Sequence, residues 1–333
     1  MENTNVQSSK KLFSKLGAMY LLGSILILAV QRGIAALIHL LTPDFAATHS
    51  TLYFVLMMMS MYIICMPLMM FFITRIPVPQ APVNKKKMTF GKWLLAFVIC
   101  YAGMYLSNII GLLFTSIFGA IIGQPVSNDL LSIATTNNMW ANFLIMVILA
   151  PIYEELLFRK LLIDRTSQYG EGVSVLFSGL MFGLFHGNVN QFVYAFTIGC
   201  VFGYVYVKTR DVKYTIFLHM LVNFFGSILG VFFLKLAGLD QMATITDPAE
   251  MTAVMMENMG GLILFMGYAL LLVVMVIVGI ILFFVNLKKY SFAKTEDTLP
   301  KGQRFKGYVC NPGMVLYILF WIVMIILQLF GIA

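Results

Sequence analysis

Long, nearly uncharged apolar runs constrain this chain more than any other feature of its sequence. A helix needs about 20 apolar residues to cross the hydrocarbon core of a bilayer. In lipid, only helices and closed β-barrels satisfy all of their backbone hydrogen bonds. The runs lack the alternating apolar and polar pattern of a membrane β-barrel, so they indicate helices. We therefore predict an all-α, polytopic membrane helix bundle of nine spans, at approximately 16–41, 51–74, 93–121, 138–159, 172–187, 191–208, 214–236, 260–287 and 312–332.

Composition supports this class and excludes others. Charged residues make up 11% of the 333 residues and hydrophobic residues 60%, with a mean hydropathy of +0.91, whereas soluble domains contain about 25% charged residues. The net charge of +8 is spread over alternate loops, so we interpret it as a topology signal and expect no nucleic acid partner. The four cysteines show no C-x-x-C spacing, which argues against a zinc ribbon or a disulfide framework.

The basic loops also orient the spans. Of the 22 Lys and Arg residues, 20 lie in the N-terminal tail and in the loops after the second, fourth, sixth and eighth spans. Because cytoplasmic loops carry an excess of Lys and Arg, we predict a cytoplasmic N-terminus and an external C-terminus in a bacterial plasma membrane. The fifth span is the shortest, and we expect it to be tilted or incomplete. We divide the chain into N-terminal spans at 1–90, a core at 91–236 and C-terminal spans at 237–333.

The stretch P-I-Y-E-E-L-L-F-R, Pro151 to Arg159, places charges at the end of the fourth apolar run. Such charges are costly in a bilayer and mark functional sites. Glu155 and Arg159 are four residues apart, so they share a helix face and can pair. Glu154 lies about 100° round the helix from Glu155. We predict that Glu155 and Arg159 form a structural ion pair, and that Glu154 is a free carboxylate suited to general-base chemistry.

Two later apolar spans each carry a histidine. Phe182 to His186 reads F-G-L-F-H, and His219 to Asn223 reads H-M-L-V-N. His219 and Asn223 share a helix face and could donate hydrogen bonds to a developing oxyanion. Counted from the basic residues that follow or precede them, Glu154 and His219 both lie about 9 Å below the cytoplasmic surface. His186 lies about 22 Å from the start of its span, which does not agree with that depth.

These three motifs in this order resemble the CAAX protease and bacteriocin-processing (CPBP, or Abi) family, which includes the type II CAAX prenyl endopeptidase. The resemblance implies an intramembrane endopeptidase that acts on lipidated, hydrophobic or membrane-anchored peptides. By the same resemblance, Glu154 and His186 activate a water, and His219 and Asn223 form the oxyanion site. The supporting residues would be Glu155, Arg159 and Phe182.

Several alternatives stay open at the level of sequence. Glu154, His186 and His219 could bind zinc as a His₂Glu set, although the H-E-x-x-H motif is absent and we favour chemistry without a cofactor. The ion pair and the H-x-x-x-N motif could simply join helices. The chain would then be a catalytically silent bacteriocin-immunity factor or a membrane scaffold. A transporter is a third interpretation, but we find no inverted repeat in the sequence.

Overall fold

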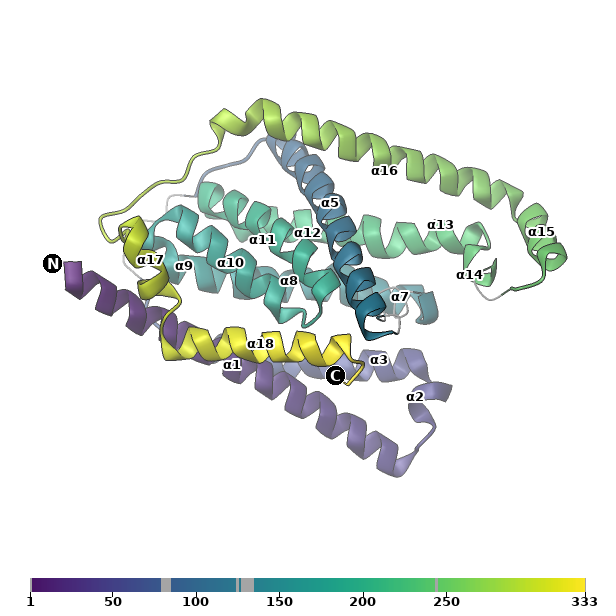
Figure 1. The fold of residues 1–333 in the computed structure, drawn as a ribbon, viewed down its shortest axis with the longest axis horizontal. Coiled ribbons are helices and arrows are strands. Elements are labelled where there is room, and N and C mark those ends of the chain that lie inside the picture. Colours follow the sequence, from purple (N-terminus) through teal and green to yellow (C-terminus); the bar gives the residue numbers. More distant parts are fainter. Residues whose placement is uncertain (1, 79–84, 124–125, 127–134, 243–244, 333) are drawn as a thin grey trace.

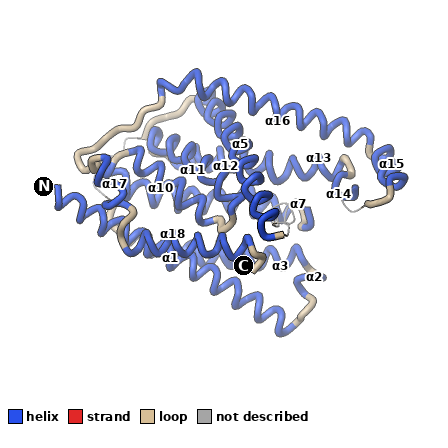
Figure 2. Tube along the Cα trace, in the orientation of Figure 1, coloured by secondary structure: helices blue, strands red, loops and turns tan. Residues whose placement is uncertain are grey.

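The computed structural model describes residues 2–78, 85–123, 126, 135–242 and 245–332, and none of them forms a β-strand (Figures 1 and 2). The predicted all-α, multi-pass membrane bundle is confirmed. Among the described residues, eight helices are long and apolar enough to cross a bilayer: Asn5–Leu41, Ser50–Thr74, Phe90–Ile122, Met139–Tyr169, Val189–Thr209, Val212–Leu236, Met259–Lys289 and Pro312–Leu329.

The described elements follow one another along the chain. They are α1 (Glu2–Leu41), α2 (Phe45–Thr48), α3 (Ser50–Met59), α4 (Met66–Thr74), α5 (Phe90–Ile122), α7 (Met139–Asn142), α8 (Ala150–Glu155), α9 (Leu162–Thr166), α10 (Glu171–Phe185), α11 (Val189–Thr209), α12 (Val212–Asn223), α13 (Gly230–Leu236), α14 (Leu239–Met242), α15 (Pro248–Glu257), α16 (Met259–Asn286), α17 (Lys301–Tyr308) and α18 (Pro312–Leu329). Segments of π-helix at Ser60–Cys65, Phe143–Leu149, Leu156–Leu161 and Phe224–Leu229 join several of these elements into longer rods.

The fifth predicted span forms α10, and it is short. Its 15 residues extend about 22 Å at 1.5 Å per residue, against about 30 Å for a hydrocarbon core. The helix is nevertheless buried along most of its length, because α11, α9 and α18 pack around it. A helix that is enclosed by protein does not have to match the bilayer thickness itself, so α10 can begin and end inside the bundle.

Small residues let α10 and α11 approach each other closely at the centre of the bundle. A Cβ atom added to Gly199 of α11 would lie 3.0 Å from the Cα atom of Gly179, and one added to Gly183 would lie 3.0 Å from the carbonyl oxygen of Phe192. Contacts of this kind replace the hydrophobic effect, which does not drive helices together in lipid. This close approach sets the distance between α10 and α11.

The two ends of the chain lie side by side. Helices α1 and α18 run next to each other in Figure 1. A Cβ atom on Gly313 would lie only 1.8 Å from the carbonyl oxygen of Ser14, and the Gly313 amide donates a hydrogen bond to the Ser14 hydroxyl at 3.1 Å. Further along α18, the hydroxyl of Tyr317 donates to the carbonyl of Met181 in α10 at 2.9 Å. The C-terminal span therefore supports the short helix α10.

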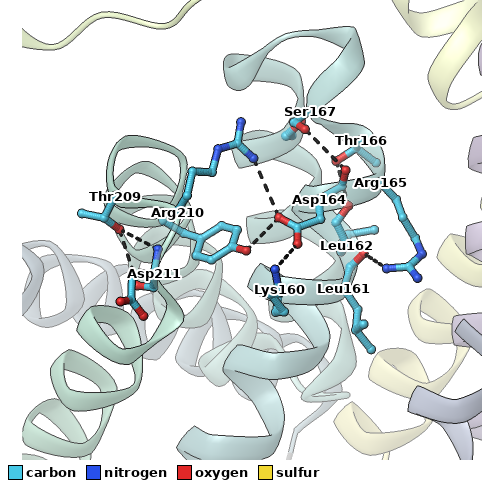
Figure 3. A network of polar contacts seen from close by, with 12 residues as sticks. Lys160, Leu161, Leu162, Asp164, Arg165, Thr166, Ser167, Thr209, Arg210 and Asp211 are labelled. Carbon is cyan, nitrogen blue, oxygen red and sulfur yellow. Dashed lines mark hydrogen bonds and ion pairs between the residues drawn. The ribbon is translucent and has the colours of Figure 1, made fainter. Parts of the chain in front are cut away.

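A buried carboxylate ties the basic ends of two spans together (Figure 3). Asp164 accepts from Lys160 at 2.5 Å and from the hydroxyl of Tyr206 at 2.7 Å, and Arg210 lies 3.8 Å from it. On the other side of the same helix, Arg165 donates to the carbonyls of Ile76 and Leu161, both at 2.9 Å. These contacts anchor the end of the helix that carries Glu154.

Helix α16 lies along the outer edge of the bundle in Figure 1. It touches α5 where a Cβ atom on Gly279 would lie 2.5 Å from the carbonyl oxygen of Val98, and it touches the end of α13 at Gly261. Only 11% of the most hydrophobic stretch of this helix is buried, so most of its surface is available to lipid.

The division into domains at 90/91 and 236/237 remains a prediction.

Candidate active site

The two glutamates lie on a short α-helical segment between two π-helical segments. Helix α8 is preceded by Phe143–Leu149 and followed by Leu156–Leu161, both π-helical. Pro151 has no backbone N–H and cannot continue the regular hydrogen-bond ladder of an α-helix. Pro67 likewise follows the π-helical segment Ser60–Cys65. Since π-helical turns often occur at functional sites, this local geometry agrees with a special role for α8.

Glu155 sits between two partners rather than one. Its Oε2 atom lies 3.1 Å from Nε of Arg159, as the spacing of four residues predicted. Its Oε1 atom lies 3.1 Å from Nδ1 of His219. The Glu155 and Arg159 side chains are both 0% exposed. Their contact is an ion pair and not a hydrogen bond, because Oε2 and Nε have no hydrogen-bond partner among the described residues. One carboxylate therefore holds both a cation and a histidine ring from another helix.

His219 in turn faces the second glutamate. Because Glu155 accepts at Nδ1, the geometry assigns the proton of the neutral ring to that nitrogen and leaves Nε2 free. Nε2 lies 3.8 Å from Oε2 of Glu154. Both side chains are largely buried, with the His219 side chain 4% and the Glu154 side chain 11% exposed. The order Arg159, Glu155, His219, Glu154 thus forms a continuous line of charged and titratable groups across two helices.

Phe182 brings the two histidines onto one aromatic surface. Its ring contacts His186 edge-on at 4.9 Å and His219 edge-on at 5.7 Å between centroids. The guanidinium of Arg159 lies 4.4 Å from the centre of the same ring. Arginine over an aromatic face is favourable, and more so when water is excluded. Phe182 therefore fixes the positions of three site residues at once.

His186 is placed differently from its predicted partner Glu154. It caps the C-terminus of α10, and its Nδ1 atom lies 2.8 Å from the carbonyl oxygen of Phe182. Within the described residues no carboxylate lies within 4.0 Å of it. The carbonyl assigns the ring proton to Nδ1, so Nε2 is left as an acceptor. The structure thus brings His219, and not His186, next to Glu154.

Asn223 begins from the same helix face as His219 but reaches toward another segment. Its side-chain amide donates to the carbonyl of Met146 at 2.8 Å. Met146 belongs to the π-helical segment Phe143–Leu149, so this bond joins α12 to the helix that carries Glu154. An amide nitrogen has two hydrogens, and the second is available to a ligand. Asn223 can therefore position the helices and also donate to bound substrate.

The zinc alternative finds little support in the donor geometry. Among the described residues, no group of three His, Cys, Asp or Glu side chains is arranged to hold a metal ion. The contacts of Nδ1 of His219 with Glu155 and of Nδ1 of His186 with a carbonyl oxygen leave Nε2 as the possible ligand atom of each ring. The observation against zinc is therefore only that the described donors do not converge. We derive no step through a metal at Glu154, His186 and His219, and metal independence remains a prediction.

Two further residues of the site were not identified from sequence. Phe202 of α11 packs its ring 5.2 Å from the His219 ring and 5.5 Å from the Arg159 guanidinium. Ser178 of α10 donates to the carbonyl of Phe158 at 2.8 Å and accepts a longer contact from Arg159 at 3.5 Å. Neither residue carries a motif. The sequence signal for Ser178 is that it lies one helical turn before Phe182.

Comparison with known proteins identifies the segment that contains all of these residues. Residues 136–225 match the family described as type II CAAX prenyl endopeptidase Rce1-like. The chain is also 24% identical over 173 residues to the "Putative membrane peptidase YdiL" of Bacillus subtilis (strain 168). The aligned region covers 50% of this chain and 68% of that protein. No solved structure matches the chain. These findings confirm the resemblance to the CAAX protease family, while the bacteriocin-related part of it stays a prediction.

Proposed function

We propose that this chain, whose core is similar to the Rce1-like CAAX endopeptidases, is an intramembrane endopeptidase that cleaves with an activated water. The observation that carries the proposal is the pair Glu154 and His219, 3.8 Å apart and largely buried. His219 is oriented by Glu155, which is itself paired with Arg159. A carboxylate that orients a histidine is a recurrent device for fixing which ring nitrogen is free. Here it directs Nε2 toward Glu154.

The proposed reaction needs no group beyond those of the chain and water. One water molecule can reach Oε2 of Glu154 and Nε2 of His219 with hydrogen bonds of about 2.8 Å. Glu154 takes a proton from it, and the resulting hydroxide attacks the carbonyl carbon of the scissile bond. The oxyanion accepts a hydrogen bond from the free N–H of Asn223, while the neutral His219 ring keeps its proton on Nδ1 and orients the water through Nε2. The C–N bond then breaks, and the leaving amine takes the proton held by Glu154.

His186 has a supporting part in this scheme. Its Nδ1 proton is engaged by the carbonyl of Phe182, so the opposite nitrogen is an acceptor. A water has two hydrogens, and it can donate one to Glu154 and the other to either His219 or His186. This role comes from the family resemblance, since His219, and not His186, lies next to Glu154. We therefore place His186 as a group that orients the water, with Glu154 as the general base.

The substrate class follows from the surroundings of the site. The basic residues at the ends of α9, α11 and α12, and their distance from Glu154 and His219, favour a site just below the cytoplasmic surface. A peptide that is lipidated, hydrophobic or membrane-anchored is held at that depth by the bilayer itself. We propose such a peptide as the substrate.

Comparing membrane peptides between cells that express the unaltered chain and cells that express Glu154→Ala tests the proposal. New peptide N-termini that appear only with the unaltered chain identify substrates. The His186→Ala variant should reduce the abundance of the same N-termini, but less than Glu154→Ala does. An Asp247→Ala variant, altered in an exposed polar segment, serves as the control. Identical peptide sets from the unaltered and Glu154→Ala chains would refute peptidase activity and favour the silent immunity or scaffold alternative.

A further inference from the structure

A basic cavity lies beside the N-terminal part of α1, at the start of the membrane-spanning part of the chain. None of the site residues described above lines it. It has a volume of about 470 Å³ and opens between the first turns of α1 and the junction of α17 with α18. Three lysines of α1 line it, together with Ser14 and the exposed Cys310. The lysines are Lys10, Lys11 and Lys15. No acidic residue lines the cavity, so it is strongly cationic.

The three lysines are available to a ligand. Lys10 is half-buried and Lys11 and Lys15 are exposed, and none forms an ion pair with a described carboxylate. Ser14 accepts a hydrogen bond from the amide of Gly313 at 3.1 Å, and its own O–H is therefore free to donate. Four donors, three of them charged, line one open space that is large enough for a phosphate group and its substituents.

The surface next to the cavity changes from basic to apolar along α1. Residues spaced by three or four positions place Lys11, Lys15, Ala18, Leu22 and Ile25 on one helix face. Along this face the lysines come first, and the exposed side chains of Leu22 (58%) and Ile25 (43%) follow.

The neighbouring helix α18 also carries exposed apolar side chains. Its residues Leu316 and Leu319 are 55% and 51% exposed, and α18 packs directly against α1. A soluble anion would use only the basic end of such a surface. A molecule with an anionic head and long apolar chains would use both ends.

We propose that this cavity binds the headgroup of an anionic phospholipid of the cytoplasmic leaflet, with its acyl chains along the exposed apolar face of α1 and α18. The lysine ammonium groups and the Ser14 hydroxyl would donate to the phosphate oxygens. Basic pockets between membrane helices on the cytoplasmic side are suited to such headgroups. The site is separate from Glu154 and His219 and does not depend on the proposed peptidase activity.

Native mass spectrometry of the full chain, released from nanodiscs of mixed phosphatidylcholine and phosphatidylglycerol, tests this proposal. We expect the unaltered chain to retain phosphatidylglycerol preferentially. A variant with Lys10→Gln, Lys11→Gln and Lys15→Gln should lose that preference. The matched control carries Lys87→Gln, Lys288→Gln and Lys294→Gln, the same charge change at exposed lysines outside the cavity, and should keep it.

A single variant protects the test against loss of insertion. Lys15→Gln leaves two lysines in the N-terminal tail, and it should weaken retention about fivefold, the contribution of one lysine near a membrane surface. Equal retention of phosphatidylglycerol by the unaltered chain and the Lys15→Gln variant would overturn the proposal. So would an equal loss in the matched control, or displacement of the lipid by millimolar inorganic phosphate, which would assign the cavity to a soluble anion.

Discussion

Glu155 has two functions, to neutralise Arg159 and to orient His219, and replacing it by glutamine affects both. Glu155 contacts Arg159 with one oxygen and His219 with the other, both at 3.1 Å. Glutamine has nearly the same shape but no charge. The change therefore leaves Arg159 buried without its counter-ion. It also replaces the charged acceptor of the His219 ring by a neutral amide, whose NH2 group can face the ring as readily as its oxygen, so the ring is held less firmly.

The expected size of each effect follows from the burial of the groups. Removing one partner of a fully buried ion pair costs about 3–5 kcal/mol of folding free energy, and both side chains here are 0% exposed. Loss of a carboxylate that orients a metal-bound histidine lowers activity by about 10- to 100-fold, and we expect a loss of the same order here because Glu155 orients His219 in the same way. Arg159→Met should cost a similar free energy, because it leaves Glu155 buried and unpaired. It should reduce cleavage less, because Glu155 still holds His219.

The two variants are compared in the same nanodiscs by SDS-induced unfolding and by the rate of cleavage of a membrane-anchored peptide. A double variant, Glu155→Gln with Arg159→Met, completes the cycle and should be more stable than the sum of the single losses predicts. The reasoning is refuted if Glu155→Gln and Arg159→Met lower cleavage equally at equal stability. In that case Glu155 would act only through the ion pair.

Three further outcomes are expected. Gly17→Ala should destabilise the chain by about 1–3 kcal/mol, because the new methyl group would lie 2.5 Å from the backbone of Gly313; unfolding measurements beside the control Gly33→Ala, which meets nothing within 4 Å, check this. Tyr206→Phe removes a 2.7 Å hydrogen bond to Asp164 and should cost about 1.5–3 kcal/mol, which the same unfolding assay measures, and an unchanged stability would contradict it. Chelators should leave cleavage unchanged, and a loss of activity that added zinc restores would contradict metal independence.

Long apolar runs made most of the fold predictable. Their lengths and the alternation of basic loops indicated the spans, and most helices follow them to within a few residues. The first helix begins earlier than predicted, at Asn5, and the fourth continues beyond Arg159 to Tyr169. A further exception is α10, where the sequence shows a run too short for the bilayer. Burial by neighbouring helices resolves that difficulty, and such burial depends on contacts between segments far apart in the chain. One of these is the bond from Tyr317 to Met181, which no local pattern indicates.

The candidate site was predictable where its residues share a helix. The spacing of Glu155 and Arg159 indicated their pair, and it forms. The contact of Glu155 with His219 crosses from one helix to another, and the sequence offered only a hint of it in the equal depths of Glu154 and His219. His186 was placed beside Glu154 by family resemblance alone. In the structure it reaches the site through Phe182, whose ring contacts both histidines.

The most direct test of the account is the cleavage rate of the purified chain with Glu154→Gln, measured on a membrane-anchored peptide in nanodiscs. Glutamine keeps the shape of the side chain but cannot take a proton from water. The account predicts a loss of about 10²- to 10⁴-fold, the usual contribution of a general base, with unfolding unchanged and with Glu250→Gln, on an exposed helix, fully active. A Glu154→Gln chain that cleaves as fast as the unaltered chain would contradict it.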